Sequence, residues 1–313
     1  MSDAFERFGL TSRLWQAETV LPIEAAHFQE LVSAKDCLLA CLNLEEAYDL
    51  VILNYISFET AMVATVVGNL IEKGMARAEQ EAARREIDRH IVNLLAVGEM
   101  YGDHLRVAAK RVFGRKSPER DAIDQAFEKQ RTTFVGFRAS EKLRDAVLHH
   151  ALPVSSWSSG GRWLDRDGEK MAVLQHSFSV GLDPSVLECG RGSDPKLAGA
   201  LKARADKDGS VSWTSIVREY VEGLSNIHKD ARELFGDREK AALELIEIDR
   251  QMFRATDGVS EYPGLVVVVA VELGRGGRHK HEVTLEFDYE ERIGPLRKKN
   301  GQLVNLYRRE ILG

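Results

Sequence analysis

The feature that most constrains this fold is an apolar stripe with heptad spacing near the start of the chain. Its members follow one another at alternating intervals of four and three residues: Leu44, Tyr48, Val51, Tyr55, Phe58 and Met62. Such spacing places the side chains on one side of an α-helix, where they pack against partner helices. The stripe therefore predicts one or two helices over residues 30–73, with Gly74 as a stop.

Two more helices follow from similar patterns. A second heptad stripe predicts a helix that ends near Gly114, and its members are Ile87, Ile91, Leu94, Gly98, Tyr101, Leu105, Ala108 and Val112. Ser117 and Pro118 predict the start of a third helix, because serine caps helices and proline suits the first turn. We expect this helix to continue through Phe134 and Phe137 and to stop before Pro153.

The composition changes after Pro153. We expect a loop at SSWSSGG (155–161), a hairpin turn at 165–168 and a strand over 170–180. A helix is expected over 212–235, with an extension to residue 253 as the alternative end. The chain then ends in two strands joined by GRGGRH (274–279). In the last strand Val283, Leu285, Phe287 and Tyr289 alternate with polar residues. The prediction is α+β: an antiparallel helical bundle over 1–153, then a smaller mixed region over 154–313 that ends in a β hairpin.

Composition narrows the class of protein. Hydrophobic content of 44%, charged content of 29% and a net charge of -6 are typical of a soluble globular protein, and they exclude a globally basic coat for nucleic acid. We expect no membrane span and no secretory leader, so the predicted location is cytoplasmic. Cys37, Cys41 and Cys189 are too few for a disulfide framework. We expect Trp157, Trp163 and Trp213 to pack in the core or beneath loops.

Positive charge is concentrated locally. Residues 104–120 hold six basic residues and one acid, and residues 292–309 hold six basic residues and no acid. Solvated helix and tail surface is the ordinary explanation for such clusters, and the functional alternative is contact with phosphate backbones. The residues predicted to contact RNA are Arg106, Lys110, Arg111 and Arg115.

Other common functional motifs are missing from the sequence. GRGGRH lies between two strands and is typical of a hairpin rather than a phosphate loop. His279 and His281 lie two residues apart without an obvious third metal ligand. We therefore predict neither a metal nor a cofactor.

One helix end carries a candidate catalytic motif, RDAVLHHALPV, in which four residues separate Arg144 from His149. Together with the long helices before it, including EEAYDLVILNYISFE at 45–59, this motif resembles the HEPN family over residues 30–155. Ribonucleases of that family carry an arginine, a polar residue and a histidine in an R-x4-6-H motif. The resemblance implies a metal-independent endoribonuclease that acts as a homodimer, in the manner of toxins and phage-defence effectors, with an antitoxin or regulatory protein as a further partner.

The chemistry suits these residues. Arg144 would hold the scissile phosphate, His149 would transfer protons, and Asp145, at i,i+4 from His149, would orient the imidazole. On one helix Arg144 and His149 are about 140° apart and ~7.5 Å along the axis, so a second copy would help to focus both on one phosphate.

Structural explanations compete with this one. Arg144 at i,i+3 from Glu141 forms an ordinary helix ion pair, and His149 suits the last turn of a helix. The alternative function is a non-catalytic HEPN-like scaffold that binds a nucleotide, RNA or a partner protein. An inactive RNA-binding protein is a third reading.

Overall fold

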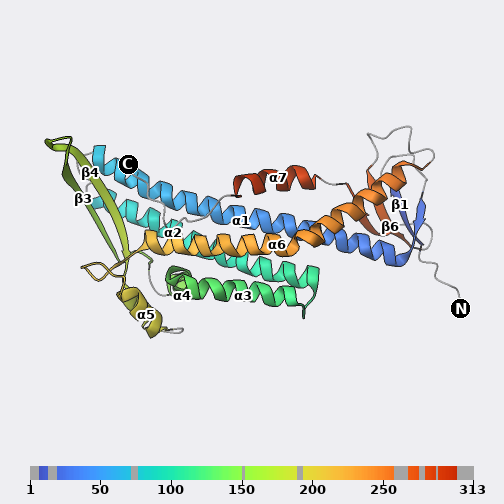
Figure 1. The fold of residues 1–313 in the computed structure, drawn as a ribbon, viewed down its shortest axis with the longest axis horizontal. Coiled ribbons are helices and arrows are strands. Elements are labelled where there is room, and N and C mark those ends of the chain that lie inside the picture. Colours follow the sequence, from blue (N-terminus) through green and yellow to red (C-terminus); the bar gives the residue numbers. More distant parts are fainter. Residues whose placement is uncertain are drawn as a thin grey trace. The chain divides into compact units, whose positions relative to one another are not determined.

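The computed structural model describes residues 7–12, 20–71, 77–149, 152–188, 193–256, 267–274, 279–286 and 288–301. The helices are α1 (Ala25–Ile71), α2 (Arg77–Phe113), α3 (Pro118–Thr133), α4 (Val135–His149), α5 (Pro195–Lys202), α6 (Trp213–Arg254) and α7 (Tyr289–Lys299) (Figure 1). The strands are β1 (Arg7–Ser12), β2 (Leu21–Ile23), β3 (Ser156–Arg166), β4 (Glu169–Leu182), β5 (Val211–Ser212), β6 (Val268–Leu273) and β7 (His279–Thr284). The predicted α+β class, with its helical part first and strands near the end, is confirmed.

The chain forms two compact units, each assembled from separated segments. The first unit consists of Met1–Glu46, Leu105–Arg120 and Ala231–Lys299. The second unit consists of Ala47–His104, Asp121–Asp230 and Asn300–Gly313. The long helices α1, α2 and α6 contribute residues to both units, so the boundary expected at residue 153 falls inside the second unit.

The first unit contains a four-stranded antiparallel sheet in the order β2-β1-β6-β7. The central strand β6 is buried from Val268 to Val271, as its uninterrupted apolar run requires. The predicted strand through Tyr289 is wrong: β7 ends at Thr284, and Tyr289 begins α7. The Tyr289 hydroxyl donates to Glu239 Oε1 at 2.9 Å, and this buried hydrogen bond holds the start of α7.

Helices dominate the second unit, and the first heptad stripe from Tyr48 to Met62 is buried there as predicted, apart from the half-buried Tyr55. Tyr48, Val51 and Phe58 are almost fully buried. A polar network lies among these apolar residues: the Tyr48 hydroxyl donates to Ser225 Oγ at 2.8 Å, and the ring of Tyr48 stacks on His228. Burial without partners would be costly for these groups, so the network fixes how the helices pack.

The third predicted helix is two helices, because the chain breaks at Phe134 between α3 and α4. The predicted cap is confirmed: Ser117 Oγ accepts a hydrogen bond from the Arg120 amide at 3.2 Å. At the break, the hydroxyls of Thr132 and Thr133 both bond back to the Lys129 carbonyl, and such bonds bend helices.

The segment SSWSSGG is a strand rather than the predicted loop. β3 pairs with β4 in antiparallel register, with Trp157 opposite Val180, and together they form a long two-stranded ribbon (Figure 1). Opposite the serine-rich segment, β4 places the buried Phe178 and Val180, and local composition does not reveal such a partner. The predicted turn is confirmed: Asp167 and Gly168 both have positive φ.

Trp213 and Trp163, two of the three tryptophans predicted to pack in the core or beneath loops, have different environments. Trp213 is fully buried and donates from Nε1 to the Pro153 carbonyl at 2.8 Å, so its predicted core position is confirmed. Trp163 is 53% exposed, which makes its predicted core position wrong. It lies on the distal half of the β3–β4 ribbon, opposite Leu174, where neither face of the ribbon is buried.

Helix α1 is more apolar than the sequence prediction assumed. By length and composition alone it is long and apolar enough to cross a membrane. The expected absence of a membrane span stays a prediction. Core helices of soluble proteins meet the same criterion when they are mostly buried. Here only 28% of the most apolar 18-residue window is buried.

Candidate functional site

The predicted catalytic arginine lies on α4 and pairs with two carboxylates. The Arg144 guanidinium forms ion pairs with Glu99 on α2 and with its neighbour Asp145. The Arg144 Nε donates to Asp145 Oδ1 at 3.0 Å, and 22% of the Arg144 side chain is exposed. The positive charge is therefore largely balanced within the second unit.

The predicted partners of Arg144 behave differently from one another. Asp145 is exposed and binds Arg144. His149 is the last residue of α4, and its side chain lies outside the described residues, as does His150. The predicted pairing of Arg144 with Glu141 is wrong, because Glu141 accepts a two-pronged hydrogen bond from Arg131 at 2.7 and 2.9 Å. That bond joins α3 to α4.

A buried tyrosine lies beside this cluster. Burial raises the pKa of Tyr220 above its ordinary value, and the nearby negative charge of Glu141 adds to the effect. Gly98 on α2 makes room for Tyr220: a Cβ at Gly98 would lie 2.2 Å from the tyrosine hydroxyl. Helices α2 and α6 therefore pack closely at Gly98, and the Arg144–Glu99 ion pair links α4 to α2.

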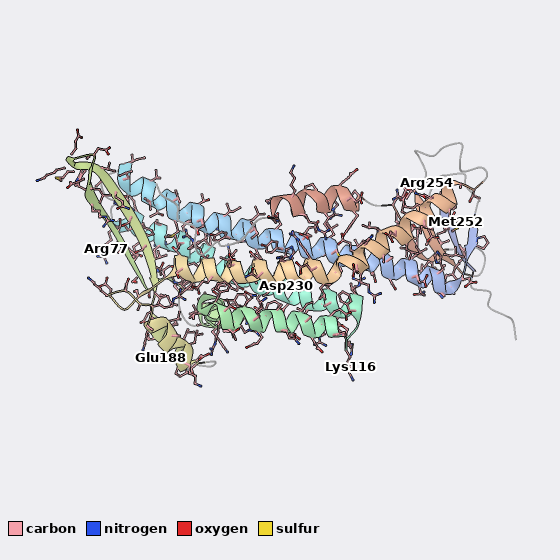
Figure 2. The ribbon with its side chains drawn as sticks, in the orientation of Figure 1. Arg77, Lys116, Glu188, Asp230, Met252 and Arg254 are labelled. Atoms are coloured by element: carbon pink, nitrogen blue, oxygen red, sulfur yellow. The ribbon has the colours of Figure 1, made fainter. Side chains whose placement is uncertain are left out.

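The predicted RNA-contacting residues belong to the first unit. Arg111 donates to Asp36 Oδ1 at 2.5 Å, which balances its charge. Lys110 and Arg115 are exposed, and Arg106 is half-buried. Lys116, at the turn after α2, points away from the helices (Figure 2). Lys110 and Arg111 occupy the last turn of α2, where positive charge stabilises the helix end without any ligand.

Sequence reasoning missed a long exposed surface on α1. Seven large aliphatic side chains, between 37% and 73% exposed, form what we call the α1 apolar face: Leu50, Leu53, Ile56, Val63, Val67, Leu70 and Ile71. At 3.6 residues per turn, all of them except Leu50 fall within an arc of about 100°. Isolated exposed aliphatic residues are ordinary, but a continuous row of this length marks an interaction surface.

The α1 apolar face carries no charge. Glu59 is the only charged residue between Asp49 and Glu72. Arg218 on α6 binds Glu59 through two hydrogen bonds of 2.7 and 3.0 Å, so this carboxylate is engaged inside the second unit. A helix that is apolar on all sides is normally buried on all sides. The signal in the sequence that could have revealed this surface was therefore the near-absence of charge between Asp49 and Glu72.

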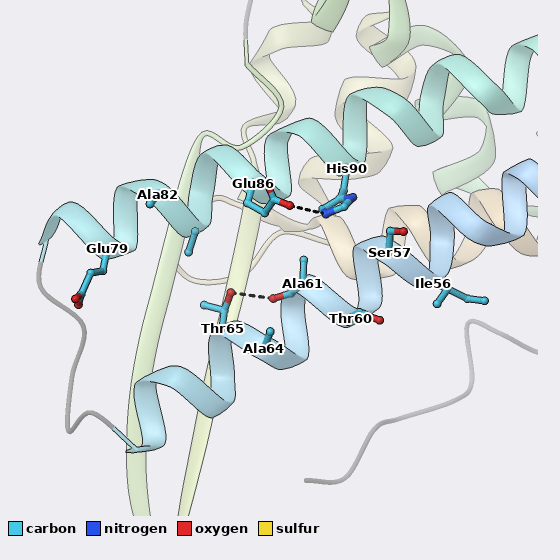
Figure 3. A pocket seen from close by; sticks show the side chains of 11 residues that line it. Ile56, Ser57, Thr60, Ala61, Ala64, Thr65, Glu79, Ala82, Glu86 and His90 are labelled. Carbon is cyan, nitrogen blue, oxygen red and sulfur yellow. Dashed lines mark hydrogen bonds and ion pairs between the residues drawn. The ribbon is translucent and has the colours of Figure 1, made fainter.

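A groove lies between α1 and α2 along the middle of this face (Figure 3). Its volume is about 690 Å³, and small side chains make up most of its lining: Ser57, Thr60, Ala61, Ala64, Thr65, Ala82 and Ala83. Thr65 Oγ1 bonds to the carbonyl of Ala61 in its own helix, which leaves the floor largely apolar. Small side chains leave space for another helix to approach.

Acidic residues and one histidine border the groove on α2. Glu86 Oε1 lies 3.1 Å from Nε2 of the buried His90. A hydrogen bond from Arg89 holds the pKa of Glu86 below its usual range. The pair of Arg85 and His90 has the same spacing as Arg144 and His149, but His90 lines the groove and contacts Glu86. The charge of Glu86 at this border is therefore balanced by Arg89.

Metal chemistry receives no support from the geometry. Among the residues that the structure describes, no group of three or more His, Cys, Asp or Glu side chains is placed to hold a metal ion. His281 instead meets the ring of Phe28 edge-on, with 5.5 Å between ring centres. Cys37 and Cys41 are buried neighbours on α1 and form no disulfide.

Comparison with known proteins adds no relative. No protein-family model matches the chain, and neither characterised proteins nor solved structures give a match. The resemblance to the HEPN family therefore stays a prediction.

Proposed function

We propose that this protein is a non-catalytic helical scaffold that works by binding another protein through the α1 apolar face. The observation that carries the proposal is the exposure of seven large aliphatic side chains on one uncharged helix face. Burial of a whole aliphatic side chain contributes about 1.5–3 kcal/mol, so these half-exposed side chains offer about 7 kcal/mol in total. That amount is comparable to the cost of association, about 4–15 kcal/mol.

The surroundings of Arg144 support a scaffold over an enzyme. A phosphate bound by Arg144 would have to displace Glu99 and Asp145, which already pair with the guanidinium. Ordinary ion pairs that cross from one helix to another stabilise a fold without any substrate. In this proposal Arg144 joins α4 to α2 and has no chemical role.

Endoribonuclease activity is the second candidate function, in the toxin or phage-defence setting that the resemblance implies. The observation that favours it is the partial exposure of Arg144 and Asp145 near the end of α4, the helix that closes with His149. Its partners would be RNA and an antitoxin or regulatory protein.

One experiment separates the two functions. Purified wild-type protein, Arg144→Ala and His149→Ala are incubated with structured and unstructured RNA in EDTA, and the unfolding free energy of each is measured. We expect no cleavage above a mock purification, and a loss of about 1 kcal/mol of stability in Arg144→Ala. Cleavage by the wild type that both variants lose, without loss of stability, would establish the enzyme and overturn the scaffold.

A further inference from the structure

We propose that the α1 apolar face binds the same face of a second copy of this chain, with the two α1 helices antiparallel about a two-fold axis at Thr60. This inference rests on the proposed function, because it names the protein that the scaffold binds. It goes further by fixing the orientation of the helices and the residues that meet across the axis.

The order of side chains along α1 is symmetric about Thr60. In a two-fold antiparallel pair, a residue before the axis meets the residue equally far beyond it on the other copy. The pairs that meet are Leu50 with Leu70, Leu53 with Val67, Ile56 with Ala64, and Ser57 with Val63. Large residues therefore meet at two pairs toward the ends of the face, Leu50 with Leu70 and Leu53 with Val67, and near the axis a large residue always meets a small one. Ile71, the last residue of the face, falls opposite Asp49.

The groove lies where this pairing needs close approach. Thr60 and Ala64 line both the groove and the centre of the exposed helix side. The opposite wall of the groove on α2 includes Ala82 and Ala83, whose small side chains leave space. A helix that enters a groove is recognised through side chains at three- and four-residue spacing, which the α1 apolar face provides. The second copy thus supplies the ridge that this groove accepts.

Charge favours a copy of this chain over a charged partner. The net charge of -6 repels two copies in general, and this repulsion is least where an uncharged surface of one copy meets an uncharged surface of the other. The α1 apolar face satisfies this condition, because Arg218 engages Glu59 and Arg89 pairs with Glu86 at the groove border. A basic or acidic partner would find no complementary charge on the face.

The area suits a reversible dimer. The face is about 30 Å long, from 21 residue steps of 1.5 Å. At about 30 Å² for each buried methylene, its exposed aliphatic parts amount to about 400 Å² per copy, or about 800 Å² per pair. Thr60, Ala64 and the groove walls bring the total near 1,000 Å², the low end for specific interfaces. We therefore expect a dimer whose population depends on concentration.

Sedimentation equilibrium over a wide concentration range tests the interface. The wild type is compared with Thr60→Glu, which places two carboxylates together at the axis, and with Val107→Glu, which adds the same charge at an apolar α2 position that is 64% exposed. We expect wild type and Val107→Glu to dimerise alike, and Thr60→Glu to raise the dissociation constant at least about tenfold. A wild type that stays monomeric, or a Thr60→Glu that dimerises equally well, overturns the proposal.

Cysteine cross-linking tests the orientation, in full-length protein with Cys189→Ser. Thr60→Cys should form a disulfide with the same residue of a second Thr60→Cys molecule. Leu50→Cys should not, but a mixture of Leu50→Cys with Leu70→Cys should form the mixed disulfide. Self-linking of Leu50→Cys in preference to this mixture would show parallel helices and overturn the antiparallel arrangement. Circular dichroism on each variant shows that the fold is retained.

A vesicle assay tests the competing occupant, a lipid bilayer. The wild type should stay in solution when neutral phosphatidylcholine vesicles are floated. A monomeric protein that floats with the vesicles, and is released by Thr60→Glu, would assign the face to a membrane and overturn the dimer. These outcomes are independent of the RNA assay. Cleavage of RNA by a dimeric protein would overturn the scaffold function but not the dimer. A monomeric protein that cleaves no RNA would overturn the dimer but not the scaffold function.

Discussion

At the scale of single residues, glycines and polar contacts decide how closely the helices of this protein pack. Gly98 allows Tyr220 to reach the surface of α2, and Gly223 on α6 similarly leaves room for the ring of Phe137. Neither glycine is needed for backbone conformation. The heptad stripe predicted that the position of Gly98 faces a partner helix, but the identity of the partner came only from the fold.

We predict that Gly98→Ala destabilises the protein by about 1–3 kcal/mol, because the new methyl group would overlap the Tyr220 hydroxyl. The matched control is Gly236→Ala on α6, where nothing lies within 4 Å and the better helix propensity should add up to about 1 kcal/mol. Urea denaturation measures both. Addition of Tyr220→Phe should restore part of the loss in Gly98→Ala, and equal effects at the two glycines would contradict the packing argument.

A histidine in the first unit makes stability depend on pH. His27 Nε2 lies 2.9 Å from the buried carboxylate of Asp249, and this hydrogen bond raises the pKa of His27 above 6.5. Because the folded pKa exceeds the unfolded one, the protonated histidine contributes stability below pH 6.5, and the contribution disappears as pH rises through the folded pKa.

We therefore predict that His27→Gln lowers the unfolding free energy at about pH 5 and leaves it nearly unchanged at about pH 9. Chemical denaturation of both proteins across this range is the measurement. A difference that stays constant with pH would show that His27 acts through packing instead.

At the scale of elements, the β3–β4 ribbon shows where local sequence was least informative. Its distal half carries Trp163, Met171 and Leu174, all exposed. An isolated two-stranded ribbon is only marginally stable, and here the buried base around Phe178 and Val180 anchors it. Serine and glycine predicted a loop for β3 because strand pairing depends on a partner distant in sequence.

Replacement of residues 161–176 by Asn-Gly should leave the global stability unchanged within about 0.5 kcal/mol. The register permits this change, because Gly160 and Ser177 lie opposite each other, and Asn-Gly suits a two-residue hairpin turn. Thermal and urea unfolding test the prediction. Loss of cooperative unfolding would mean that the distal ribbon supports the second unit.

At the scale of the whole molecule, one helix serves two purposes. The stripe that includes Tyr48, Val51 and Phe58 builds the interior of the second unit, while the opposite side of α1 stays exposed and apolar. A fold that leaves such a surface uncovered is expected to bind something to it. The overall composition did not indicate this exposed apolar surface, because composition is averaged over the whole chain.

If a second copy covers this surface, thermal stability must depend on protein concentration, since association stabilises the folded state by mass action. We predict that the Tm of the wild type rises with concentration while that of Thr60→Glu does not. Differential scanning calorimetry at several concentrations measures this. Parallel behaviour of the two proteins would argue against association through α1.

The sequence by itself determined the long helices α1, α2 and α6, the heptad stripes of α1 and α2, the Ser117 cap and the Asp167–Gly168 turn, because each depends on residues close together in the chain. Tertiary structure decided which carboxylates surround Arg144, where the third helix breaks, and which side of α1 remains uncovered. Those outcomes depend on contacts between distant segments, such as Arg218 with Glu59 and Arg131 with Glu141. Periodicity identifies the apolar sides of a helix, but packing alone determines which of them meets water.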